Sequence, residues 1–421
     1  MNYKVKDLLK EFKSLFKNKK YKDLEISLEK FLKKNSENTE ALLLYSIVCR
    51  RLMKFADAEK SIIKLINLEP ENPYFYSVYG ELLFNTGLND VAKTMYKKSL
   101  ELDQDFVFSL FGLSQVYERE NNFEKAIFLL ERAINLDKNF IDAKNLLALI
   151  YKKNKSYKKA LHLFQEIKDN SSLADQLECL YYLNDRDNFF TKLNIAINQS
   201  ILSPKIASLS SHASIRYNQI DNYSFCKDPL NFIYKKNLLQ SNFLNVSLID
   251  DLLILINKDS NIYKKQKLLK NGKQTSGNLF LRNNKSIQSL LEIIKSEIKI
   301  YKKSFRDGCD MINLFPKNFS INGWVIKIQN EGHLDSHIHE NGWLSGSIYL
   351  DMPKNILAGE GDIVFSLHGG NYPVEDKKFP ETRLAPKTGD IILFPSSLFH
   401  STTPIKNNLN RISIAFDLVP I

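Results

Sequence analysis

Cysteines are few and long hydrophobic runs are absent, and both features limit what this chain can be. The four cysteines, Cys49, Cys179, Cys226 and Cys309, lie far apart and form no CxxC pair. We therefore expect reduced, mostly buried thiols in a cytoplasmic protein. No run of about eighteen apolar residues occurs, so no transmembrane helix is expected. The first residues carry no apolar segment of the kind found in a signal peptide, and none is predicted.

The positive charge is unevenly distributed along the chain. The net charge of +11 comes from 59 Lys and Arg against 48 Asp and Glu, yet residues 320–421 hold eight basic against eleven acidic residues. The basic excess lies upstream, is mostly Lys, and is mixed with Glu and Asp along predicted helices. A basic surface for nucleic acid or an anionic membrane is one interpretation. We favour solvated helix faces instead, and expect neither nucleic acid nor a membrane as partner.

The first 174 residues contain an internal repeat. Four alanines, Ala58, Ala92, Ala126 and Ala160, follow one another at intervals of 34 residues. A small residue is needed where two antiparallel helices cross closely, and larger apolar residues four positions later would fill the groove. Residues 39–174 resemble four tetratricopeptide repeats, preceded by a degenerate unit at 5–38. The resemblance implies an all-α solenoid that presents a surface to a protein or peptide partner, and it leaves a homo-oligomer open.

The remaining chain changes character twice. At 421 residues two or three domains are expected. We predict the repeat solenoid with a capping helix at 1–200, a linker and helical and β support region at 201–319, and a β-rich core at 320–421. In the last part, short β-branched and aromatic segments alternate with Gly, Pro and Asn turns. The predicted fold class is α+β multidomain, with the solenoid followed by a double-stranded β-helix, a jelly-roll or cupin-like barrel.

Histidines are concentrated at one place in this last part. The chain has seven, and His333, His337 and His339 fall within seven residues, together with Asp335. The four alternate with period two, so on one strand their side chains would leave the same face. Imidazole nitrogen and carboxylate oxygen suit iron, zinc or copper. The alternative is a polar strand edge that faces water.

A second block downstream supplies complementary groups. His400 ends a later predicted strand, about sixty residues after the first motif, and could complete a ligand set on the opposite strand. Arg411 begins the last predicted strand, with Ser413 two residues on. A buried Arg beside a Ser hydroxyl would bind a carboxylate through charge-assisted hydrogen bonds.

These blocks, with Gln274-Thr-Ser-Gly upstream, resemble the 2-oxoglutarate- and Fe(II)-dependent dioxygenases. They look most like the bacterial branch in which tetratricopeptide repeats precede the oxygenase, and the likeness covers about the last 150 residues. The resemblance implies Fe(II), 2-oxoglutarate as co-substrate and O₂, and a hydroxylated protein, peptide or small molecule. The far carboxylate of 2-oxoglutarate would meet Arg411, with Ser413 and Tyr349 as hydrogen-bonding neighbours.

The first motif departs from the family's common His-x-Asp or His-x-Glu. His333 with Asp335 has the usual ligand types, but His337-x-His339 directly precedes the Gly-Trp-Leu-Ser-Gly block and matches this branch. We favour His337, His339 and His400 as metal ligands, with Asp335 orienting a ligand ring. His368 is expected on a surface loop. Two other functions remain as alternatives: an interaction scaffold with a catalytically silent barrel, and a cupin-type metalloenzyme without 2-oxoglutarate.

Overall fold

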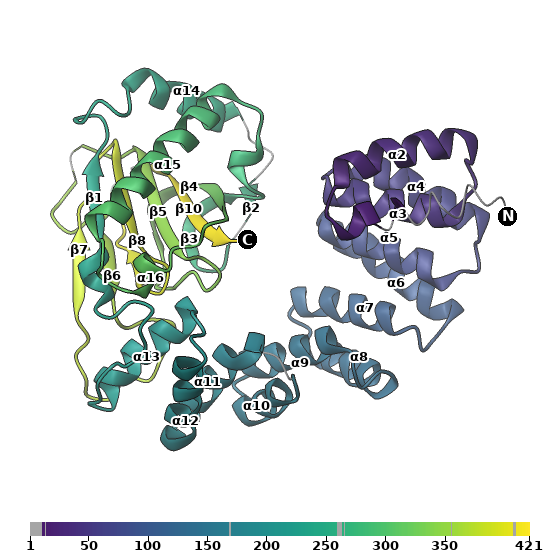
Figure 1. Cartoon of the computed structure of the whole chain (residues 1–421), viewed down its shortest axis with the longest axis horizontal. Helices are drawn as coiled ribbons and strands as arrows, with labels where there is room; N and C mark the ends of the chain where they lie inside the picture. The colour runs from purple at the N-terminus through teal and green to yellow at the C-terminus, as the bar shows by residue number, and fades with distance from the viewer. Residues whose placement is uncertain are drawn as a thin grey trace. The chain divides into compact units, whose positions relative to one another are not determined.

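The computed structural model describes residues 11–421 apart from 13, 168–169, 259–262, 265, 355 and 407–409. The chain forms two compact units, Met1–Asp169 and Asn170–Ile421. Strands are described in the second unit and helices in both (Figure 1). The predicted order, a helical repeat region followed by a β-rich domain, is confirmed. The finer division at residues 200 and 319 stays a prediction.

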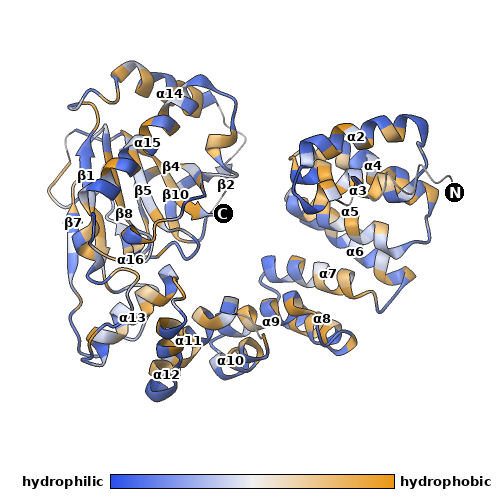
Figure 2. Ribbon diagram, viewed as in Figure 1, coloured by the Kyte–Doolittle hydropathy of each residue, from blue (hydrophilic) through white to orange (hydrophobic). Residues whose placement is uncertain are grey.

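The first unit consists of consecutive helices that pack on their neighbours along the chain. Apolar and polar positions alternate along each of them (Figure 2), as helices with one buried side require. The described helices are α2 (Tyr21–Lys34), α3 (Thr39–Arg51), α4 (Phe55–Leu68), α5 (Pro73–Asn85), α6 (Asn89–Leu102), α7 (Val107–Arg119), α8 (Phe123–Leu136), α9 (Ile141–Lys153) and α10 (Tyr157–Glu166).

The repeat register explains the packing of this unit. The four alanines spaced at 34 residues are all fully buried, as the helix-crossing argument predicted. Tyr96, four residues after one of them, is buried between two neighbouring helices. A Cβ atom added at Gly80 would lie 2.8 Å from the Tyr96 ring, and one at Gly112 would lie 2.3 Å from it. Each buried large side chain of this kind stabilises the fold by about 1.5–3 kcal/mol.

The second unit begins with helices and then forms two antiparallel sheets. Its helices are α11 (Leu173–Tyr182), α12 (Arg186–Asn198), α13 (Pro204–Arg216), α14 (Val246–Lys258), α15 (Lys285–Ser304) and the short α16 (Asp310–Asn313). Its 3-10 helices are η1 (Asn170–Ser172), η2 (Pro229–Phe232) and η3 (Leu279–Leu281). Among the described residues, none of the helices combines the length and the apolar composition needed to cross a lipid bilayer.

The strands are β1 (Tyr234–Asn237), β2 (Tyr263–Lys264), β3 (Leu269–Thr275), β4 (Phe319–Leu334), β5 (Leu344–Asp351), β6 (Ile363–Ser366), β7 (Glu381–Leu384), β8 (Asp390–Pro395), β9 (Phe399–Thr402) and β10 (Arg411–Pro420). The larger sheet has the order β1-β8-β5-β10-β4-β3-β2 and the smaller one β7-β6-β9. Tyr349, Phe365 and Phe394, from β5, β6 and β8, share one buried apolar cluster, so part of the core lies between the sheets. The jelly-roll connection itself stays a prediction.

Helices α11–α13 are fastened to the loops of the β-rich part of the same unit. The hydroxyl of Tyr182 donates to the carbonyl of Gly370 at 2.9 Å. Arg216 pairs with Glu375 through Nε at 2.9 Å and Nη2 at 2.6 Å. These bonds reach the loop between β6 and β7, so the helices and the sheets form one packed body.

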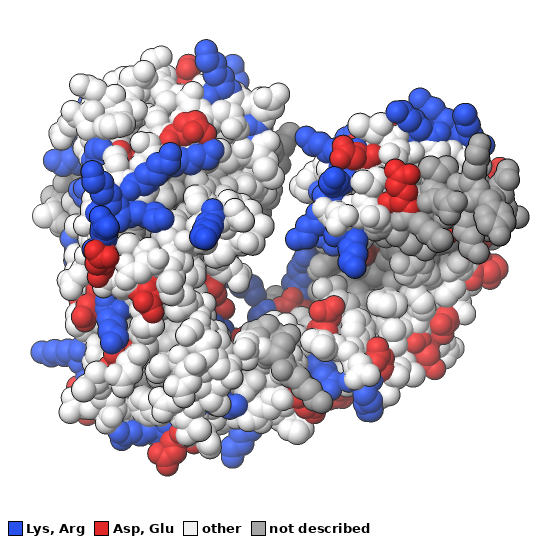
Figure 3. All heavy atoms as spheres, in the orientation of Figure 1, with Lys and Arg blue, Asp and Glu red and all other residues white. Residues whose placement is uncertain are grey.

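Charged side chains of both signs lie on the surface of each unit. On the face drawn in Figure 3, blue Lys and Arg side chains are accompanied by red Asp and Glu side chains on both. Several of the Lys residues form ion pairs, including Lys93 with Glu120 at 2.9 Å. Exposed pairs of this type contribute little to stability, about 0–1 kcal/mol each. The arrangement agrees with the solvated helix faces that the sequence favoured.

Candidate metal centre

Two elements bring three histidines together. His400 lies on β9, whereas His337 and His339 lie in the loop between β4 and β5. The four alternating residues do not share one strand, because β4 ends at Leu334. The loop nevertheless follows β9 at one point: the backbone N–H of His337 donates to the carbonyl of His400 at 3.1 Å, and the reverse bond is 3.0 Å.

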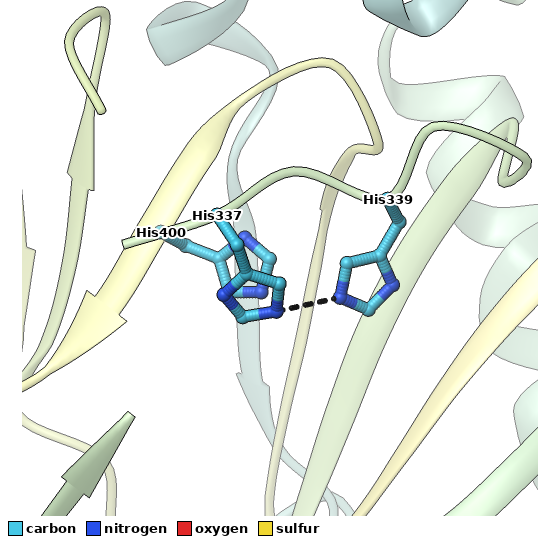
Figure 4. Close-up of side chains that lie close together, drawn as sticks. All are labelled: His337, His339 and His400. Carbon is cyan, nitrogen blue, oxygen red and sulfur yellow. Dashed lines mark hydrogen bonds between the residues drawn. The ribbon is translucent and has the colours of Figure 1, made fainter. Parts of the chain in front are cut away.

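The three imidazoles converge on one point (Figure 4). Each offers a ring nitrogen, and these nitrogens all lie within 4.8 Å of one another. The Nε2 atoms of His337 and His339 are 3.1 Å apart. Three neutral imidazole nitrogens at such spacing are a donor set for a transition metal such as iron, zinc or copper.

The other nitrogen of each ring faces an oxygen acceptor. The pairs are His337 Nδ1 with the Asp335 carbonyl at 2.9 Å, His400 Nδ1 with the Leu398 carbonyl at 3.3 Å, and His339 Nδ1 with Asp417 Oδ1 at 2.5 Å. An acceptor at Nδ1 favours the tautomer with the proton there and leaves Nε2 as an electron-pair donor. The acceptors thus orient all three rings for coordination.

Burial keeps two of these rings neutral. Desolvation, and then the neighbouring His339, lower the pKa of His337 to about 4. Desolvation also holds the pKa of His400 well below its usual value, with His337 and His339 adding to the effect. A metal binds the neutral form of imidazole, so at neutral pH these two ligands need lose no proton.

The alternative ligand pair, His333 and Asp335, lies outside this cluster of three histidines. His333 Nε2 is 3.3 Å from Asp335 Oδ1, and Asp335 Oδ2 is 3.3 Å from Lys270 Nζ. Within the described ranges, neither residue joins the three histidines as a potential ligand group. The expected orienting role of Asp335 falls to its backbone carbonyl, which faces His337, and not to its carboxylate.

The remaining predicted site residues line the same cavity as the histidines. The cavity has a volume of about 360 Å³, and its wall includes Arg411, Ser413 and Tyr349 as well as His337, His339 and His400. All six residues selected from the sequence therefore surround one space. Trp324, Ile326 and Phe394 supply apolar parts of the wall.

Arg411 is a buried cation with few polar partners. Its exposed fraction is 4%, and Nη1 donates to the carbonyl of Gly361 at a long 3.4 Å. Its Nε has no hydrogen-bond partner among the described residues, and neither has the buried Oε1 of Gln274 in the same wall. Burial lowers the pKa of Arg411 and raises that of Tyr349 to about 12. Because a buried unpaired charge is costly, this wall fits an anionic ligand.

Asp417 is a site residue that the sequence argument missed. Its Oδ1 accepts from His339 and also from the hydroxyl of Ser345 at 2.7 Å. The signal was the alternation along β10: Arg411, Ser413 and Asp417 stand at odd positions of one strand and hence on one face.

His368 does lie on a loop, but its ring is not simply exposed to solvent: Nδ1 is 2.9 Å from Nε2 of His212.

Family comparisons match helical repeats in the upstream part of the chain and an oxygenase family in the downstream part. The family described as "Putative 2OG-Fe(II) oxygenase" matches residues 322–417. The tetratricopeptide repeat family matches residues 73–106, and the family of anaphase-promoting complex, cyclosome, subunit 3 matches residues 119–184. No curated protein matches the chain.

Among solved structures, the chain is similar to several at low identity. PilW, a type IV pilus biogenesis factor, is 15% identical over 50% of this chain and 99% of its own, with a TM-score of 0.44. PilF of Pseudomonas aeruginosa is 14% identical over 49% and 96%, with a TM-score of 0.42. TTC0263, a tetratricopeptide-repeat protein of Thermus thermophilus, is 18% identical over 42% and 98%, with a TM-score of 0.37. Nothing further follows from TM-scores below 0.5. The chain thus carries tetratricopeptide repeats in its N-terminal part and, at residues 322–417, a domain that matches the family described as "Putative 2OG-Fe(II) oxygenase".

Proposed function

We propose that this protein is a 2-oxoglutarate- and Fe(II)-dependent dioxygenase. One observation carries the proposal: a single cavity is lined both by three convergent histidines and by a buried arginine whose Nε has no partner among the described residues. The first group suits a divalent metal, and the second suits a carboxylate. An oxygenase that uses 2-oxoglutarate needs both groups in one space.

Each residue then has a definite task. His337, His339 and His400 would hold Fe(II) through their Nε2 atoms. Arg411 would bind the far carboxylate of 2-oxoglutarate, with the hydroxyls of Ser413 and Tyr349 as further donors. When bound, Fe(II) with 2-oxoglutarate and O₂ supplies the oxidising chemistry, which yields succinate, CO₂ and an oxidised substrate.

Other side chains orient the histidine rings and exclude water from part of the cavity. The carboxylate of Asp417 accepts a hydrogen bond from Nδ1 of His339 and so fixes the orientation of that ring. The indole of Trp324 stacks on the same ring, with centroids 5.8 Å apart and planes at 29°. Ile326 and Phe394 are buried in the wall and limit the water that reaches the ligands. Water exclusion strengthens the electrostatic attraction between Arg411 and a carboxylate.

A cupin-type metalloenzyme without 2-oxoglutarate is the second candidate, because three histidines also suit zinc. That alternative gives Arg411 no task. A catalytically silent scaffold is the third, and it explains neither group in the cavity. We further propose that the repeats bind the protein or peptide substrate or partner, and that the protein is cytoplasmic.

The test is an anaerobic titration of the full-length protein with Fe(II) and 2-oxoglutarate, followed by exposure to O₂. We expect a weak visible charge-transfer band and O₂-dependent succinate. Arg411→Ala should retain Fe(II) but require far more 2-oxoglutarate for the band. Arg383→Ala, at an exposed arginine that pairs with Glu381, is the matched control and should behave as the wild type. Absence of both the band and succinate in the wild type would refute the proposal.

A further inference from the structure

Two cysteines that are far apart in the sequence lie beside each other in the second unit. Cys226 precedes η2, and Cys309 directly precedes α16. The segments are joined by backbone hydrogen bonds, from Asp310 N–H to the Ser224 carbonyl at 3.3 Å and from Met311 N–H to the Phe225 carbonyl at 2.7 Å. The two thiols lie close enough for each to influence the pKa of the other.

The two thiols have different surroundings. Cys226 is 1% exposed, whereas Cys309 is only partly buried and so can meet a small oxidant from solvent. The neighbouring Cys226 lowers the pKa of Cys309, an effect that burial opposes and that the backbone near Ile312 and Met311 supports. The neighbouring Cys309 and burial raise the pKa of Cys226. One sulfur is thus partly accessible to solvent, and the other lies next to it in the protein interior.

We propose that Cys226 and Cys309 form an oxidation site, at which hydrogen peroxide converts the two adjacent thiols into a disulfide. The Cys309 thiolate attacks one peroxide oxygen, the O–O bond breaks, and a sulfenic acid and hydroxide form. The Cys226 thiol then attacks the sulfenic sulfur, the S–O bond breaks, and the oxygen leaves as water. The two thiols lose two electrons, and one peroxide becomes two waters.

The pair is linked to the candidate metal centre through Trp343. The indole Nε1 donates to the carbonyl of Met311 at 2.8 Å. The ring of Phe225, next to Cys226, packs edge-on against the indole at a centroid distance of 5.0 Å. Trp343 ends the loop that carries His337 and His339. Formation of the disulfide therefore acts on the segments of Phe225 and Met311, the two residues that contact this tryptophan.

The other two cysteines serve as internal controls. Cys49 and Cys179 are both fully buried, in different units of the chain. Burial raises the pKa of Cys49 to about 11, so little of it is ionised at neutral pH. Peroxide reacts with the thiolate, and neither residue presents one to solvent.

The first test is thiol counting on the reduced full-length protein before and after hydrogen peroxide, under denaturing conditions. We expect two of the four thiols to disappear and to return with dithiothreitol. Non-reducing peptide mapping should show one linked peptide joining Cys226 and Cys309. Cys226→Ser should give no linked peptide, and Cys179→Ser should give the same link as the wild type. Four intact thiols, a link to another cysteine, or an over-oxidised Cys309 beside free Cys226 would each overturn the proposal.

The second test uses tryptophan fluorescence and requires no catalytic activity. The chain has two tryptophans, so Trp324→Phe isolates the emission of Trp343. A neighbouring disulfide quenches indole fluorescence, and we expect a loss of emission on oxidation that dithiothreitol reverses. Adding Cys309→Ser, at the more exposed and hence better tolerated position, should abolish the response. An equal loss of emission in that double variant would contradict the assignment. The outcome does not depend on the proposed oxygenase function.

Discussion

Asp417 and His339 are joined by a hydrogen bond of 2.5 Å between Oδ1 and Nδ1. The carboxylate comes from β10 and the imidazole from the loop between β4 and β5, so the bond ties a metal-ligand candidate to the rigid sheet. Both side chains are mostly buried, with exposed fractions of 12% for His339 and 15% for Asp417. An ion pair or hydrogen bond at this depth is less weakened by water than one at the surface.

Removing this carboxylate should weaken metal binding. We expect Asp417→Ala to lower the affinity for Fe(II) by about 10- to 100-fold, since the ring of His339 loses its orientation and part of its basicity. Asp417→Asn, which can still accept at Oδ1, should lose less. The measurement is anaerobic competition with a coloured chelator. Asp351→Asn, at an exposed carboxylate of β5, is the control and should leave the affinity unchanged.

The choice between the two histidine registers can be decided by paired substitutions. His337→Ala should abolish Fe(II) binding, because it removes one of three convergent nitrogens. His333→Ala should retain binding, because its Nε2 faces Asp335 outside the cluster. The same chelator competition measures both. Loss of binding in His333→Ala alone, with His337→Ala unaffected, would return the site to the first register.

Lys205 on α13 is a buried cation that holds three carboxylates. Its Nζ lies 2.7 Å from Asp175, 2.8 Å from Glu178 and 3.2 Å from Glu340. Burial alone would lower the pKa of Lys205, but the three carboxylates raise it well above its usual value. Glu340 directly follows His339, so the cluster connects α11 and α13 to the ligand loop.

Lys205→Met should therefore destabilise the second unit by about 1.5–3 kcal/mol, since it removes the charged hydrogen bonds that hold three clustered, partly exposed carboxylates. Hydrogen exchange should show faster exchange in α11, α13 and the loop at 335–343. Lys227→Met, at an exposed lysine of the same unit, should leave exchange unchanged. Unaltered protection in Lys205→Met would mean that the ion cluster is not what holds the loop.

His212 predicts an acid-sensitive region around α13. Its ring is fully buried against the hydroxyl of Tyr181, the ring of Phe379 and Nδ1 of His368. Burial, and then the charges of His368 and Arg216, lower the pKa of His212 from 6.5 to about 3. Between pH 6.5 and pH 3 the unfolded chain binds a proton at this histidine and the folded chain does not. The free energy of unfolding is therefore highest above pH 6.5 and decreases as the pH is lowered towards 3.

The expected loss is at most about 1.4 kcal/mol per pH unit over this window. His212→Gln removes the titration and should flatten the pH dependence of hydrogen-exchange protection in α13, relative to the wild type. His162→Gln, at an exposed histidine of α10, should leave it unchanged. Equal slopes in wild type and His212→Gln would show that another group governs the acid response.

The repeat unit was predictable because its signal is periodic. One small residue every 34 positions, with a large apolar residue four positions later, can be satisfied only by helices that cross in a fixed register. The histidines were predictable for a different reason: they are rare in this chain and gathered in one motif. Arg411 and Ser413 were proposed from the Arg-x-Ser pattern at the start of the last predicted strand, together with the family resemblance.

Other features could not be obtained from the sequence. The end of β4 at Leu334 follows a register shift between β3 and β4, and Glu331 has a positive φ of 62°. No pattern in the amino-acid sequence indicates such a local irregularity. The contact between His212 and His368 joins residues on different elements, neither of which belongs to a motif. Asp417 was hidden because a lone aspartate in a strand is ordinary until its partner is known.

The bonds from α11–α13 to the loops at 335–343 and 367–380 also determine where the chain can be truncated without loss of these contacts. A fragment that starts at residue 170 keeps Lys205, Arg216 and Tyr182 with the loop groups that they bind. One that starts after residue 216 leaves Glu340 and Glu375 without their cations and removes the buried ring of His212 from beside Phe379. Proteolysis or gene truncation between these limits would therefore disturb the loop that carries His337 and His339, although no cavity residue is lost from the chain.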